Sequence, residues 1–136
     1  MIMPSSPLRR PYLLLFRESS PDLYEALSVG ERQALMQKWN NWYQELFDSG
    51  RVSHGHPLDP DGRRVSGADG QRVVSFRSQE VELAVAGYFV VTVANLEEAT
   101  EIAQQCPTLF LGMTVEVRGI TECCHLARSL QASPAF

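Results

Sequence analysis

The order of hydrophobic and polar residues along the chain predicts four strands that form one sheet. Residues 12–16 are hydrophobic at every position, which is typical of a central strand covered on both faces. Residues 51–56 fit a second strand, and residues 87–93 are rich in the β-branched and aromatic residues that strands favour. Over residues 113–118 hydrophobic and polar side chains alternate, which predicts a strand with one dry and one wet face.

Helical spacing of large hydrophobic residues predicts a long first helix. Ser28 and Glu31 have the spacing of a capping box, in which each side chain hydrogen-bonds the free backbone amide of the other residue. Gly50 supplies the left-handed conformation that commonly ends a helix. The hydrophobic residues that repeat between these ends are Leu35, Trp39, Trp42 and Leu46. We therefore expect this helix to bury a broad aromatic stripe.

A second, shorter helix is predicted between residues 87–93 and 113–118. Asn95 and Glu98 repeat the capping spacing, and Pro107 ends the segment. Its hydrophobic face consists of Ala99, Ile102, Ala103 and Cys106.

Between the second and third strands of this sheet, a glycine-containing segment predicts a hairpin. Residues 65–66 and 72–76 flank the turn Gly-Ala-Asp-Gly at residues 67–70. Residues 19–27 fit a loop or a short helical turn, and residues 78–86 fit a short helix or a loop. The full order is strand, helix, strand, hairpin, strand, helix, strand. This order predicts an α+β fold of the ferredoxin-like type, which is a split βαβ unit with an antiparallel sheet.

Two helices can cover only one face of a four-stranded sheet. Residues 12–16 and the positions Phe89, Val91 and Val93 are hydrophobic, and they cannot all point at the helices. An exposed hydrophobic sheet needs a partner surface. We therefore expect a homodimer that forms through the open face of the sheet.

At 136 residues the chain suits one domain with its own core. We expect a flexible N-terminal arm over residues 1–11, the domain itself over residues 12–121, and a polar C-terminal tail over residues 122–136.

Composition argues against nucleic acid and membrane partners. The net charge is -4 with acidic and basic residues interspersed, which gives no basic footprint for nucleic acid. No hydrophobic run is long enough to span a membrane, and residues 12–16 are too short for the core of a signal peptide. Cys106, Cys123 and Cys124 are odd in number and two are adjacent, which does not fit a disulfide framework. We expect a cytoplasmic protein.

Six segments of the chain resemble the YCII-related (DGPF-type) family. They are Tyr-Leu-Leu-Leu-Phe-Arg at 12–17, Ala-Leu-Met-Gln-Lys-Trp at 34–39, Pro-Leu-Asp-Pro at 57–60, Gly-Tyr-Phe at 87–89, Cys-Pro at 106–107 and Thr-Val-Glu-Val-Arg at 114–118. The resemblance implies a dimeric α+β barrel. It implies little about activity, because most DGPF-type members have none assigned. A few relatives are small lyase-like enzymes in which a His and an Asp are proposed to line a cleft.

One departure from the family pattern concerns its signature motif. Where Asp-Gly-Pro-Phe is expected, residues 75–78 read Ser-Phe-Arg-Ser, so the signature carboxylate, glycine and proline are absent. Glu80, a few residues further on, matches the usual acidic position. The departure implies either a remodelled site or the loss of an ancestral activity.

Candidate catalytic residues gather in and near residues 54–70, which combine two histidines with four glycines and a Pro-Leu-Asp-Pro turn. On a strand, His54 and His56 share a face, where they could serve as acid and base or bind a metal. Asp59 and Glu80 are the carboxylates that could orient them. The alternatives are histidines hydrogen-bonded to backbone and an Asp59 that only stabilises a turn. A metal needs a third ligand, so we predict no metal, and without a cofactor motif we predict no cofactor.

Three further residues are candidates for ligand binding. Arg17 ends the first strand and could hold a carboxylate through two guanidinium nitrogens, or form a salt bridge with a neighbour such as Glu18. Trp42 and Tyr43 could wall a pocket for an aromatic ligand, although residues at helical spacing more often form core. These residues point to a small anionic or aromatic ligand.

Two functions stay open. The first is a homodimeric module that either binds a small ligand or is a degenerate enzyme. The missing signature motif favours this first function. The alternative is a cofactor-independent enzyme, lyase-like or oxygenase-like, which uses a His/carboxylate pair in a cleft. The enzyme requires a histidine and a carboxylate within hydrogen-bond reach inside a concave pocket.

Overall fold

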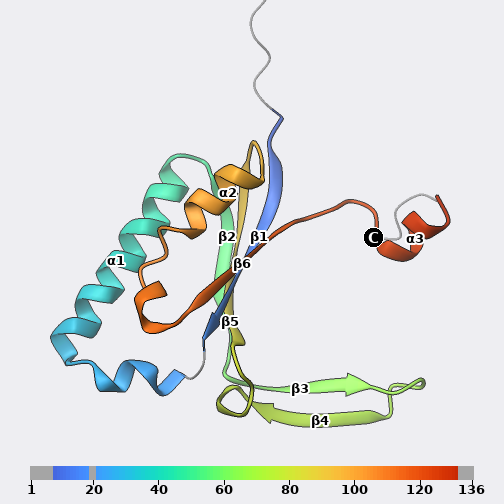
Figure 1. Ribbon diagram of the computed structural model, residues 1–136, viewed down its shortest axis with the longest axis horizontal. Coiled ribbons are helices and arrows are strands. Elements are labelled where there is room, and N and C mark those ends of the chain that lie inside the picture. The colour runs from blue at the N-terminus through green and yellow to red at the C-terminus, as the bar shows by residue number, and fades with distance from the viewer. Residues whose placement is uncertain (1–7, 19–20, 132–136) are drawn as a thin grey trace, which may run out of the picture.

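Four antiparallel strands form the central sheet of the computed structural model, in the order β2-β5-β1-β6 (Figure 1). The structure describes residues 8–18 and 21–131. The strands of this sheet are β1 (Arg10–Glu18), β2 (Val52–Pro57), β5 (Ala84–Val93) and β6 (Thr114–Gly119). Two further strands, β3 (Asp61–Ser66) and β4 (Arg72–Arg77), pair with each other in a separate hairpin.

The two long helices lie on the same side of the sheet, which Figure 1 shows nearly edge-on. They are α1 (Val29–Asp48) and α2 (Leu96–Ala103). The 3₁₀ turns η1 (Pro21–Ala26), η2 (Ser78–Glu80) and η3 (Leu109–Leu111) connect the strands and helices, and a short helix α3 (His125–Ser129) follows β6. The element order and the strand order are those of a split βαβ unit, so the predicted ferredoxin-like α+β fold is confirmed.

Ser28 and Glu31 form the capping box that their spacing predicts. The Ser28 Oγ accepts a hydrogen bond from the Glu31 amide at 3.1 Å, and Glu31 Oε1 accepts one from the Ser28 amide at 3.1 Å. These bonds, above all the one from the Ser28 amide, lower the pKa of the Glu31 carboxyl. Gly50 follows α1 with φ of +72°, the left-handed conformation expected at its end.

The predicted aromatic stripe of α1 is correct in part. Leu35, Trp42 and Leu46 are buried, whereas Trp39 is only partly buried against the core. On α2 the predicted hydrophobic face is buried as expected. Asn95 Oδ1 caps this helix by accepting the Glu98 amide at 2.9 Å. The helix ends at Ala103, earlier than the expected stop at Pro107.

The face of the sheet away from the helices is open within the described residues. Leu13 and Leu15 of β1 alternate with the buried Leu14 and point to this open face. Their partners across β5 are Val90 and Tyr88, so the four side chains lie together there, each half-buried. We call these four residues the open-face patch.

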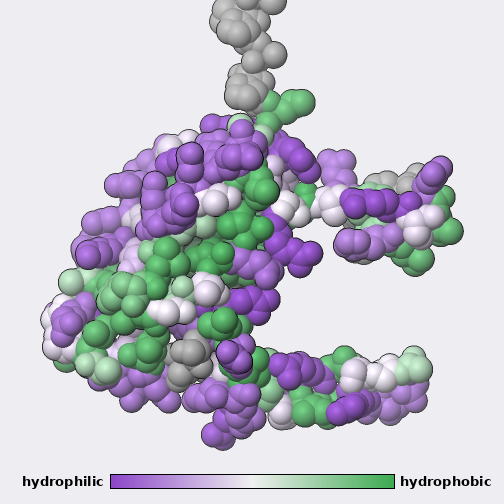
Figure 2. All heavy atoms as spheres, in the orientation of Figure 1, coloured by the Kyte–Doolittle hydropathy of each residue, from purple (hydrophilic) through white to green (hydrophobic). Residues whose placement is uncertain are grey.

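Two segments project on the side of the open face (Figure 1). One is the β3–β4 hairpin, which we call the hairpin arm (residues 61–77), and the other is α3. The side chains of Val65, Val73 and Val74 are exposed on the hairpin arm. Figure 2 shows hydrophobic and hydrophilic residues interspersed over both projections.

Some boundaries differ from the sequence predictions. Residues 84–86 belong to β5, and the hairpin strands extend beyond residues 65–66 and 72–76. The polar tail contains the unexpected helix α3, because the Cys124 Sγ caps its first turn by accepting the Ala127 amide at 3.3 Å. The flexible arm was predicted over residues 1–11, but residues 10–11 belong to β1. Residues 1–7 lie outside the described residues, as do residues 19–20 and 132–136.

Candidate functional site

A cavity of about 670 Å³ lies between α1 and the sheet. Its walls come from residues 32–43 of α1, the ends of β1 and β2, the start of β5, η1 and the segment before β6. In Figure 2 hydrophobic surface lies over the middle of the body, between the hydrophilic outer side of α1 and the sheet. We call this space the aromatic cavity, because rings form its largest walls.

The rings that line the aromatic cavity also pack against one another. Phe16 of β1 lies with its ring centroid 5.1 Å from that of Trp39 and 4.8 Å from that of Phe89. Tyr43 packs edge-on against Phe89 at 5.2 Å. Gly55 makes room for Phe89, since a Cβ at Gly55 would overlap the Phe89 ring and lie 2.8 Å from the Tyr88 carbonyl oxygen. The cavity wall is therefore built before any ligand arrives.

Polar groups line one part of the aromatic cavity. Glu18, the last residue of β1, accepts a hydrogen bond from the Tyr24 hydroxyl at 3.0 Å. Burial first, and the nearby Glu18 second, raise the pKa of Tyr24 to about 12, so its hydroxyl keeps its proton at neutral pH. Thr108 is buried next to this pair and donates to the Met113 Sδ at 3.2 Å. The cavity thus combines hydrophobic walls with one half-buried carboxylate.

Arg32, Asn40 and His56 also contribute to the cavity lining. All three are exposed residues. Arg32 and Asn40 of α1 lie where the cavity meets solvent, whereas the ring of His56 lies near Tyr88. Arg32 has no ion-pair partner among the described residues.

The predicted catalytic residues lie apart from one another. His54 and His56 share the open face, where their rings lie 5.8 and 6.0 Å from the Tyr88 ring. The Nδ1 atom of His54 contacts the Ser53 Oγ at 3.3 Å. Asp59 is exposed in the loop between β2 and β3. Among the described residues no hydrogen bond or ion pair joins either histidine to Asp59 or Glu80.

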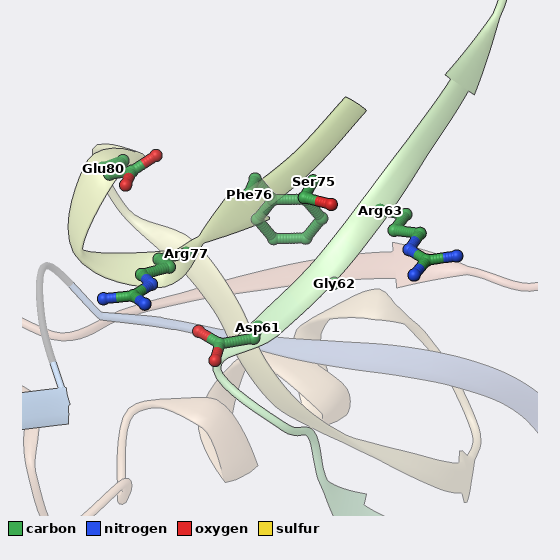
Figure 3. A pocket seen from close by; sticks show the side chains of 7 residues that line it. All are labelled: Asp61, Gly62, Arg63, Ser75, Phe76, Arg77 and Glu80. Carbon is green, nitrogen blue, oxygen red and sulfur yellow. The ribbon is translucent and has the colours of Figure 1, made fainter. Parts of the chain in front are cut away.

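Glu80 lines a second, open pocket of about 430 Å³ at the base of the hairpin arm. Figure 3 shows Asp61 and Arg77 on the same side of the Phe76 ring as Glu80, with Arg63 directed away from them. Asp61 and Arg77 are cross-strand partners, but their charged groups form no ion pair. This pocket holds charges of both signs in an exposed position, where they are well solvated.

The predicted ligand-binding residues occupy three different places. Arg17 points to the open face, donates to the Leu83 carbonyl oxygen at 3.2 Å and lies 3.8 Å from Glu116 rather than pairing with Glu18. Trp42 is buried in the core and does not line the aromatic cavity, whereas Trp39 does. Tyr43 lines the cavity, so its role in binding stays a prediction.

Sequence reasoning did not identify three of the polar residues that line the cavity, Glu18, Tyr24 and Thr108. A signal for Glu18 was present, because the alternation of β1 continues from Leu14 through Phe16 to Glu18 on the helix-covered face. Tyr24 and Thr108 come from separate connecting segments and carry no motif.

Within residues 8–18 and 21–131, no three metal-ligating side chains cluster. No helix in these residues is long and apolar enough to cross a membrane.

The fold and the cavity define the class: a split βαβ domain with a small-molecule-sized space between its first helix and its sheet. The profile of the YCII-related domain family matches residues 12–123, and the chain therefore belongs to the YCII-related family. No curated protein matches the chain.

Proposed function

We propose that this YCII-related domain binds a small aromatic molecule in the aromatic cavity. The observation that carries the proposal is the cavity itself, whose volume of about 670 Å³ suits a ligand of one to three rings. Ligand sites in proteins typically enclose roughly 300–1,000 Å³, with hydrophobic walls and a few polar groups. Phe16, Trp39, Tyr43 and Phe89 provide such walls, and Glu18 and Thr108 provide such polar groups.

The positions of the histidines favour binding over catalysis. The enzyme hypothesis requires a histidine and a carboxylate within hydrogen-bond reach inside a pocket. His56 and Glu18 both line the aromatic cavity, but within the described residues no hydrogen bond or ion pair joins them. Glu18 has Tyr24 as its hydrogen-bonded partner, and the ring of His56 lies near Tyr88.

Calorimetric titration with tryptophol, an uncharged indole alcohol, tests the proposal. We expect saturable one-to-one binding that weakens at least about fivefold in Tyr43→Ala, because loss of a wall ring removes about 1 kcal/mol of contact. Phe47→Ala is the matched control, since Phe47 is an aromatic residue one helical turn further along α1 that is exposed and does not line the cavity. Absence of tryptophol binding, or an equal effect of the two substitutions, contradicts the proposal.

We also propose that the domain acts as a homodimer through the open face. The open-face patch of Leu13, Leu15, Tyr88 and Val90 is half-buried and hydrophobic in the single chain. The hairpin arm supports the same partner, because an isolated two-stranded hairpin is only marginally stable in water. Its main contacts are internal, and its exposed valines need a surface to cover them. A second copy facing this side would cover both.

Size-exclusion chromatography coupled to light scattering measures the molecular mass in solution and so tests the dimer proposal. We expect twice the chain mass of 15.2 kDa for the natural sequence and the single mass for Val90→Glu, which places a charge in the open-face patch. Phe47→Glu is the control, because it adds the same charge on the exposed side of α1. A natural sequence that elutes as a monomer contradicts the dimer and leaves the ligand proposal standing.

A further inference from the structure

We propose that the aromatic cavity selects an aromatic amine, whose ammonium group pairs with the Glu18 carboxylate. This inference rests on the proposed binding function and names the chemical class of the ligand.

Among residues 8–18 and 21–131, Glu18 is a carboxylate without a cationic partner. It lines the cavity and is half-buried, and the Tyr24 hydroxyl donates to it at 3.0 Å. No Lys, Arg or His forms an ion pair with Glu18 among the described residues. The neighbouring Arg17 is directed to the other face of the sheet, where Glu116 and the Leu83 carbonyl occupy it. A ligand cation would therefore meet a carboxylate that forms no ion pair within the described part of the chain.

The rings beside Glu18 favour the same kind of ligand. A cation is attracted to the electron-rich face of an aromatic ring, and the attraction grows when the cation is desolvated. Phe16, Trp39, Tyr43 and Phe89 line the cavity together. The cation–π contacts of the described residues involve Tyr12 and Phe76, neither of which lines the aromatic cavity. Among the described residues no protein cation therefore occupies the four cavity rings, and Trp39 and Tyr43, which are only partly buried, leave ring surface for a ligand.

Arg32, in contrast, would favour a ligand of the opposite charge, such as an aromatic acid. Its side chain lines the cavity but is exposed, whereas Glu18 is half-buried. Exposed charges interact weakly because water and salt screen them, and partly buried charges are screened less. At physiological ionic strength the Glu18 carboxylate therefore decides the preferred charge of the ligand.

Three indoles with the same two-carbon linker test the inference by calorimetry at neutral pH and about 0.15 M salt. They are tryptamine, which is cationic, tryptophol, which is neutral, and indole-3-propionate, which is anionic. We expect tryptamine to bind about tenfold more tightly than either of the others, since a hydrogen bond to a charged group is worth about that factor. Glu18→Gln should abolish the preference of tryptamine over tryptophol, with both affinities measured on that variant.

Glu25→Gln is the matched control, because Glu25 is an exposed carboxylate on the same 3₁₀ turn as Tyr24 and does not line the cavity. It should keep the tenfold preference. If tryptophol binds and tryptamine is no tighter, or if Glu18→Gln keeps the preference, the amine inference is wrong and the binding function stands. If none of the three indoles binds, both are wrong. The comparison among ligands uses the natural protein, so it holds even if a variant fails to fold.

Discussion

Replacement of Gly55 by Ala tests whether the wall of the aromatic cavity is as tightly packed as the structure indicates. A Cβ at this position would overlap Phe89 Cδ1 and lie 3.0 Å from Phe89 Cε1 and 2.8 Å from the Tyr88 carbonyl oxygen. Non-bonded carbons are most stable about 3.5–4.0 Å apart, so either Phe89 or β2 must move. Phe89 is held by Phe16 and Trp42, whose ring centroids lie 4.8 and 5.2 Å away.

The free energy of unfolding should therefore fall in Gly55→Ala. Overpacking of a rigid site costs up to about 3 kcal/mol. The alanine also restricts the unfolded chain, which offsets about 1 kcal/mol. The net loss of about 2 kcal/mol corresponds to a fall in Tm of roughly 8 °C for a domain of this size.

Urea unfolding followed by tryptophan fluorescence measures the effect. Gly30→Ala is the control of opposite sign, because Gly30 is in the first turn of α1 and its nearest neighbour, the Ser28 Oγ, would be 4.0 Å from the new methyl group. Alanine in a helix is more stable than glycine by up to about 1 kcal/mol, so this variant should gain stability. If Gly55→Ala is as stable as the natural protein to within about 0.5 kcal/mol, the packing of Phe89 on Gly55 is refuted.

Three further outcomes follow from burial. Leu14→Ala should cost about 2–5 kcal/mol in the same urea assay, because Leu14 is completely buried in the centre of the sheet. Burial and Glu18 raise the Tyr24 pKa from 10.0 to about 12, so the folded state holds this proton more tightly than the unfolded state. The stabilisation that this proton provides is therefore complete below pH 10 and is lost as the pH rises through 12. Between these pH values the free energy of unfolding should fall less steeply in Tyr24→Phe than in the natural protein. A thiol reagent applied to the folded protein should label Cys123 and Cys124 much faster than the buried Cys106, whose pKa burial raises, as counted by mass spectrometry.

Much of the fold could be predicted from the sequence because short-range chemistry determines it. The capping box of Ser28 and Glu31 and the left-handed Gly50 involve residues close in the chain, and each is found where its spacing placed it. The helix α3 was missed because a cysteine sulfur, from Cys124, caps it in place of the usual hydroxyl or carboxylate.

The candidate site could not be predicted in the same way. His54 and His56 were predicted as site residues because two histidines two residues apart share one face of a strand. In the structure that face of β2 is the open face. The carboxylate of the cavity, Glu18, meets Tyr24 and Thr108 only through tertiary packing of three separate segments. Helical spacing likewise does not tell which tryptophan of α1 is central, and the structure buries Trp42 and leaves Trp39 at the cavity.

Apart from Tyr88, which belongs to the open-face patch and also lines the cavity, the two faces of the sheet separate assembly from ligand binding. Along β1, Leu14 and Phe16 face the helices, while Leu13 and Leu15 face the open side. A substitution on one face should therefore leave the function of the other intact. Val90→Glu should halve the molecular mass and change tryptophol affinity less than twofold, and Tyr43→Ala should weaken binding while the mass stays that of the dimer. If Val90→Glu also abolished tryptophol binding while circular dichroism showed an intact fold, the separation would be wrong. The partner subunit would then have to complete the cavity.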